Sequence, residues 1–165
     1  MVFLYLTSIA LMIGLDQAVK IMAKSALSHL PGMPVIQKVF YLTYAENTGA
    51  SFGILQGNSR LLGLVSAVAS LVMLLFLFAQ VKAFPRKRLY LFSLSMIIAG
   101  ALGNMIDRLI RGYVIDMFDF RIIHFAVFNV ADSFISVGAV VFCCYLLFDK
   151  QLFGSEKYGI EQKER

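Results

Sequence analysis

Charged residues are scarce in this 165-residue sequence, where they make up 15% of the chain, against about 25% in a typical soluble domain. Apolar residues make up 59%, and the mean hydropathy is +0.78. A water-soluble globule of this size needs more polar surface, and a disordered chain has low hydrophobicity. The composition therefore argues against both classes, and the length favours a single domain.

Cysteine is also rare. The only two cysteines, Cys143 and Cys144, are adjacent within an apolar run, which supports neither a disulfide framework nor a zinc site. The sequence has no His-Glu-x-x-His motif, and the spacing of His29 and His124 does not suit a metal. We therefore expect neither a metal nor a cofactor.

Long apolar segments dominate the chain instead. A helix rises about 1.5 Å per residue, so about 20 apolar residues cross a hydrocarbon core of about 30 Å. The sequence predicts an α-helical integral membrane protein whose single membrane domain covers residues 1–150. The predicted transmembrane helices are residues 2–20, 61–81, 89–106 and 125–148.

Basic residues set the expected orientation. Four cations lie within Lys82–Arg88, between the second and third predicted helices, and the positive-inside rule places such a loop in the cytoplasm. With four membrane crossings, both termini share that side, so the N-terminus and a basic tail over 149–165 are predicted to be cytoplasmic. In so apolar a chain these clusters indicate cytoplasmic loops rather than nucleic-acid binding.

Two segments then face outward, residues 21–60 and 109–124. Residues 39–44 are rich in aromatic and β-branched side chains, which favours a strand, and Asn47-Thr48-Gly49 is typical of a turn. We expect a small extracytoplasmic sheet, a β-cradle, in the first outer segment, and a loop in the second.

Polar residues gather near the outer boundary of the membrane. An ionisable group at membrane depth costs a few kcal/mol or more and is a functional candidate by default. Spacings of three and four residues place several such groups on shared helix faces, and the outer segments supply the others. The residues expected to converge are Glu46, Asn47, Asn104, Asp107, Arg108, Asp116, Asn129 and Asp132. In the first helix, Asp16 and Lys20 have i,i+4 spacing and are interpreted as a structural ion pair.

Two carboxylates brought close together have a known use in catalysis. Because like charges a few ångströms apart do not both ionise readily, the pair shares a proton. The ionised member accepts a proton from attacking water, and the protonated member donates a hydrogen bond to a peptide carbonyl. By spacing alone, this pair is any two of Asp107, Asp116 and Asp132.

Five short segments occur in order along the chain: Asp16–Lys20, Glu46–Phe52, Gly103–Arg108, Val114–Phe118 and Phe128–Ser133. Together they resemble the motifs of the bacterial lipoprotein signal peptidases (signal peptidase II). Met117 is one departure, because the family pattern has Phe at that position, and both side chains are hydrophobic.

The resemblance implies four helices under an extracytoplasmic β-cradle and a catalytic dyad of Asp116 and Asp132. It also implies that Asp16 and Lys20 support the structure around the site. The residues implied to shape the site or contact substrate and inhibitors are Asn47, Gly49, Asn104, Asp107, Arg108 and Asn129.

The resemblance further implies the substrates and the setting. Family members remove signal peptides from prolipoproteins by cutting just before a Cys that carries a diacylglyceryl group, and cyclic peptides of the globomycin type block them. We expect a monomer in the bacterial cytoplasmic membrane, with lipids around it, no nucleic-acid partner, and an active site near the outer leaflet. Because one acid lies on a helix and the other in a predicted loop, we expect the Asp116 loop or the Asn47 segment to close over substrate.

A different class competes with this interpretation. A small proton-coupled transporter would use intramembrane carboxylates as relay groups. The carboxylates of this sequence, however, cluster at one face of the membrane and do not line a path through it.

Overall fold

The structure is a computed structural model, and it describes residues 1–49, 57–123 and 125–149. The predicted basic tail beyond residue 149, His124, and the end of one family-like segment (50–52) lie outside the described residues.

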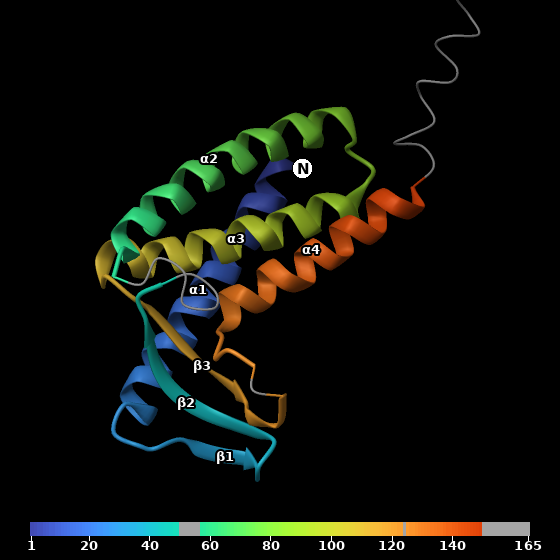
Figure 1. The fold of residues 1–165 in the computed structure, drawn as a ribbon. Coiled ribbons are helices and arrows are strands. Elements are labelled where there is room, and N and C mark those ends of the chain that lie inside the picture. The colour runs from blue at the N-terminus through green and yellow to red at the C-terminus, as the bar shows by residue number, and fades with distance from the viewer. Residues whose placement is uncertain (50–56, 124, 150–165) are drawn as a thin grey trace, which may run out of the picture.

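Four helices form the body of the molecule: α1 (Val2–Leu27), α2 (Ser59–Ala83), α3 (Arg88–Ile110) and α4 (Val130–Phe148). Each is long and apolar enough to cross a membrane, which confirms the four predicted crossings. The third helix contacts the other three, and Figure 1 shows it in the middle of the bundle. Many large apolar side chains on the outer helix faces are exposed, such as Leu64, Leu71 and Leu75, as expected of surfaces that face lipid.

A small sheet lies at one end of the bundle, beside the end of α1 and the beginning of α4 (Figure 1). Its strands, β1 (Met33–Ile36), β2 (Phe40–Asn47) and β3 (Val114–Phe120), are antiparallel in the order β1-β2-β3. A short 3₁₀ helix, η2 (Arg121–Ile123), follows β3. The sheet predicted in the first outer segment is therefore present, and it takes a third strand from the second.

The first helix is longer than predicted. It continues past residue 20 to Leu27, and its final turns present Ala23 and Leu27 to Ile115 and Met117 of β3. Burial of these side chains against the sheet stabilises the extra turns beyond what local sequence indicates. The third helix is also longer than predicted, since α3 continues past residue 106 to Ile110.

The prediction of a loop over residues 109–124 is wrong for its central part. Val114–Phe120 is a paired strand, and its side chains alternate between two environments: Ile115 and Met117 pack on α1, while Val114 and Asp116 line a cleft. Asp116 and Asp119 interrupt the apolar pattern of this segment, so the sequence did not predict a strand there. Asp116 thus lies on a paired strand, which removes the reason for expecting its segment to move.

The fourth helix begins five residues later than predicted, at Val130 rather than at residue 125. Asn129 has an extended backbone and caps the helix, because its side chain accepts from the N–H of Asp132 and Asp132 accepts from the N–H of Asn129. Such a reciprocal capping box satisfies donors that have no partner within the helix. Asp132 therefore lies in the first turn of α4, not deep within a transmembrane helix.

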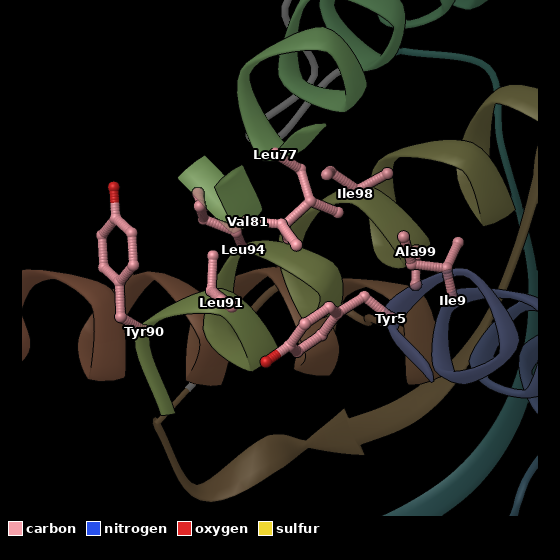
Figure 2. Packing of buried hydrophobic residues seen from close by; sticks show 9 residues of the cluster. All are labelled: Tyr5, Ile9, Leu77, Val81, Tyr90, Leu91, Leu94, Ile98 and Ala99. Atoms are coloured by element: carbon pink, nitrogen blue, oxygen red, sulfur yellow. The ribbon is translucent and has the colours of Figure 1, made fainter. Parts of the chain in front are cut away.

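The half of the bundle farther from the sheet has an apolar core. Figure 2 shows most of its buried side chains gathered between α1, α2 and α3, with Tyr90 apart from them, where its ring packs against Phe142 and Tyr145 of α4. The cluster consists of Tyr5, Ile9, Leu77, Val81, Tyr90, Leu91, Leu94, Ile98 and Ala99.

Close contact between α3 and α4 depends on glycine. A Cβ at Gly100 would clash with the carbonyl oxygen of Ala131, so even a methyl group must push the helices apart. We expect Gly100→Ala to lower the free energy of unfolding in detergent by about 1–3 kcal/mol. Gly14→Ala is the control, since a Cβ at Gly14 meets nothing within 4 Å and helix propensity favours alanine by about 1 kcal/mol. Equal stability of both variants would contradict this packing.

Candidate active site

A cleft of about 810 Å³ lies between the sheet and the adjacent ends of α3 and α4. Its walls carry both polar and apolar side chains. The polar residues that line it are Glu46, Asn47, Thr48, Asn104, Arg108, Asp116, Asp132, Ser133 and Ser136. Its apolar lining includes Phe125, Val127, Phe128, Ile135 and Val137.

The pairing of β2 with β3 is irregular directly beside Asp116. Leu42 pairs with Phe118 and Ala45 with Asp116, so two residues of β2 oppose only Met117. Such bulges bend a strand and are frequent beside active sites, where they redirect side chains. Here the bulge lies beside Asp116, and both Asp116 of β3 and Asn47 of β2 line the same cleft.

Asp116 is held by two side-chain amides. Its exposed fraction is 2%, and its two oxygens accept from Asn129 Nδ2 at 2.6 Å and from Asn47 Nδ2 at 3.0 Å. These donors come from the residue that caps α4 and from the end of β2, so three elements meet at this carboxyl group.

Asp132 is joined to Asp116 through two asparagines. Its Oδ1 accepts from Asn104 Nδ2 at 2.7 Å, and its Oδ2 accepts from the backbone N–H of Asn129 at 3.2 Å. The Nδ2 group of Asn129 also donates to Asn104 Oδ1 at 3.1 Å. Asn104 and Asn129 therefore form a continuous chain of hydrogen bonds between Asp132 and Asp116.

The electrostatic environment favours a proton at Asp116. Burial raises the pKa of Asp116 from its ordinary value to about 6, the hydrogen bond from Asn47 opposes this rise, and the negative charge of Asp132 adds to it. Near neutral pH a proton is therefore far easier to place on this pair than on an exposed carboxylate.

Arg108 and Gly49 lie at the edge of this arrangement. The Nη2 group of Arg108 donates to the carbonyl oxygen of Gly49 at 3.1 Å, and the N–H of Gly49 donates to Asn47 Oδ1 at 3.0 Å. Within the part of the chain that the structure describes, the buried Nε group of Arg108 has no hydrogen-bond partner.

Asp107 is placed differently from the other predicted acids. It does not line the cleft; it is fully buried and binds Lys20 Nζ at 2.9 Å. Lys20 also binds Asp16 at 2.9 Å. The predicted pair of Asp16 and Lys20 is therefore present, and it belongs to a larger buried network that includes Asp107.

Two members of that network were not singled out from the sequence. Arg111 binds Asp107 and donates to Gln17 Oε1 at 3.0 Å, and Gln17 Nε2 donates to Asp107 at 3.1 Å. The i,i+4 spacing of Asp107 and Arg111 was a usable signal for the first contact. Nothing in the sequence indicated that Gln17, on another helix, would join them.

Comparison with known proteins agrees with this geometry. The profile of the family described as signal peptidase (SPase) II matches residues 8–148. The chain belongs to the signal peptidase II family. It is accordingly a peptidase and a multi-pass bacterial membrane protein.

Relatives of this signal peptidase II chain match over most of its length. The lipoprotein signal peptidase of Clostridioides difficile (strain 630) is 46% identical over 146 residues, covering 88% of this chain and 95% of the relative. That of Caldanaerobacter subterraneus subsp. tengcongensis is 41% identical over 140 residues, covering 85% and 93%. A bacterial membrane enzyme solved by the in meso method at 2.3 Å resolution has a TM-score of 0.71 and 28% identity, with 88% of each chain covered.

The proton affinity of Asp116 in this signal peptidase is open to direct test. In ¹³C-aspartate NMR of the protein in detergent, we expect the Asp116 carboxyl to titrate near pH 6. Asp132→Asn removes a negative charge and should lower that pKa, whereas Asn47→Ala removes a hydrogen bond to the carboxylate and should raise it.

Asp116→Asn assigns the signal by its loss. Gly14→Ala, at an exposed position that does not line the cleft, should leave the titration unchanged. A parent pKa near 4, or shifts of the same sign in the two variants, would contradict the described environment.

Proposed function

We propose that this chain is an aspartic endopeptidase in which Asp116 and Asp132 form the catalytic dyad. The observation that supports this most strongly is that both acids line one cleft and are joined through Asn104 and Asn129. Within the described residues, no group of three or more His, Cys, Asp or Glu side chains could hold a metal.

The proposed chemistry needs one proton on the pair. The ionised carboxylate takes a proton from water as the water oxygen attacks the scissile carbonyl carbon, and the protonated carboxyl donates a hydrogen bond to the carbonyl oxygen. The tetrahedral intermediate then collapses, the C–N bond breaks, and the leaving amine nitrogen takes a proton from the pair. The proton count of the pair is restored, and no covalent enzyme intermediate forms.

The proposed substrate is a lipid-modified prolipoprotein, cut just before its diacylglyceryl-bearing cysteine. The names of the relatives support the lipoprotein class. The cleft suits such a peptide, because the apolar side chains Phe125, Phe128 and Ile135 line it together with the two acids. We include cyclic peptides of the globomycin type as ligands that compete for this cleft.

We propose an orientation in which the sheet and the cleft face outward, at the outer leaflet of the cytoplasmic membrane, and the N-terminus faces the cytoplasm. The loop of basic residues between α2 and α3 supports this by the positive-inside rule. That loop lies at the end of the bundle opposite the sheet (Figure 1). A signal helix anchored in the membrane then presents its cleavage point at the depth of the dyad.

A proton-coupled transporter is less consistent with the arrangement. Its relay groups would have to continue across the membrane, whereas the half of the bundle beyond Asn104 and Asp107 is filled by the apolar core that includes Leu91, Leu94 and Ile98.

Cleavage of a diacylglyceryl-modified prolipoprotein by the purified protein tests the proposal. We expect Asp116→Asn and Asp132→Asn each to lower kcat by about 10²–10⁴-fold, the range that general acid–base groups contribute. Both changes preserve shape while removing the exchangeable proton. Asp119→Asn is the matched control, because Asp119 lies on the same strand but pairs with Arg121 outside the cleft.

Turnover close to the parent's in either cleft variant would contradict the dyad. Activity should also persist in a strong chelator, and loss of activity there would favour a metal-dependent mechanism instead.

A further inference from the structure

The side chain of Lys20 is fully buried, away from the cleft, yet it contacts the hydrogen-bond chain that joins the two cleft acids. Its ammonium donates to Asn104 Oδ1 at 2.9 Å while binding Asp16 and Asp107 at 2.9 Å each. With its carbonyl oxygen held in this way, Asn104 must present its Nδ2 group to Asp132. A buried lysine with three such contacts has one orientation.

Each acid bound to Lys20 also holds the backbone of an element that carries a cleft acid. Asp16 Oδ1 accepts from the N–H of Ala131 at 2.9 Å, one residue before Asp132. Asp107 Oδ2 lies 3.4 Å from the N–H of Ile115, one residue before Asp116. The ion network thus contacts both α4 and β3 directly beside the acids.

We propose that Lys20 is a positioning residue for peptide cleavage: by joining Asp16 to Asp107 and holding the carbonyl of Asn104, it sets the placement of Asp116 and Asp132. This inference rests on the proposed function and extends it to a residue that does not touch substrate. An error of about 1 Å in the placement of reacting groups costs as much as about 100-fold in rate.

The charge of Lys20 also reaches the dyad. It lowers the pKa of Asp116, opposing burial and the charge of Asp132. Arg108 of α3 also faces both acids, and Glu46 of β2 lines the same cleft. Loss of Lys20 should therefore raise the pKa of Asp116, whereas loss of a distant cation should not.

The experiment compares Lys20→Met with Lys24→Met in the same prolipoprotein cleavage assay. Lys24 lies one turn further along α1, where its ammonium contacts the exposed hydroxyl of Tyr113. For Lys20→Met we expect kcat per folded molecule to fall about 10–100-fold, with KM within about threefold because the residues that line the cleft are retained. For Lys24→Met both constants should stay within about twofold of the parent.

A second variant separates positioning from stability. Lys20→Met leaves Asp16 and Asp107 as unbridged buried acids, which lowers stability. Adding Asp16→Asn removes one of these charges and retains an acceptor for the N–H of Ala131, while Asp107 keeps Arg111. The double variant should recover thermal stability relative to Lys20→Met, yet its kcat should stay low because Asn104 still lacks the ammonium.

Recovery of kcat together with stability in the double variant would overturn the proposal, as would a Lys20→Met enzyme with the parent's kcat. The pH profile of kcat gives a further readout: the limb that reports Asp116 should move to higher pH in Lys20→Met and not in Lys24→Met. An unmoved limb would also count against it. If the parent itself fails to cleave the prolipoprotein, the proposed function fails and not the role of Lys20 alone.

Discussion

The ammonium of Lys20 lies inside a membrane-embedded helix bundle, where an unpaired charge costs several kcal/mol. Asp16 and Asp107 neutralise this charge, and the contact with Asp107 fixes both the relative height of α1 and α3 and the rotation of each helix about its axis. Because the same acids reach the backbone of α4 and β3, the ion network limits the movement of all four elements. The shape of the cleft follows from this constraint, since its two acids lie on the elements so held.

The groups that touch the cleft acids directly are mostly amides rather than cations. Asn47 and Asn129 donate to Asp116, and Asn104 donates to Asp132. A neutral donor orients a carboxyl group without the strong bias toward the ionised form that a contacting lysine or arginine imposes. Lys20 therefore acts on the acids indirectly, through Asn104. Asp116 and Asp132 keep the affinity for a shared proton that the proposed chemistry needs.

Hydropathy was sufficient to predict the four membrane-crossing helices, because a helix that crosses the hydrocarbon core needs about 20 apolar residues in succession. It was less informative where packing outweighs local pattern. The extension of α1 to Leu27 depends on contacts with β3, and β3 itself was hidden because Asp116 and Asp119 interrupt its apolar residues. The helix α4 begins at Val130 because Asn129 and Asp132 form a capping box. The prediction placed the start earlier because the residues before Asn129 are apolar.

By itself, the sequence determined the membrane class, the number of crossings, the expected outward end, and the set of polar residues gathered there. These depend on composition and on spacing along single segments. Spacing left any two of three acids as the pair, and the family resemblance pointed to Asp116 and Asp132. Only the tertiary structure decided that Asp107 joins Lys20 and Arg111 while Asp116 and Asp132 line the cleft. The physical reason is that the environment of an acid in a bundle is set by which side chains of other elements lie within hydrogen-bonding distance, and spacing along one chain segment does not contain those distances.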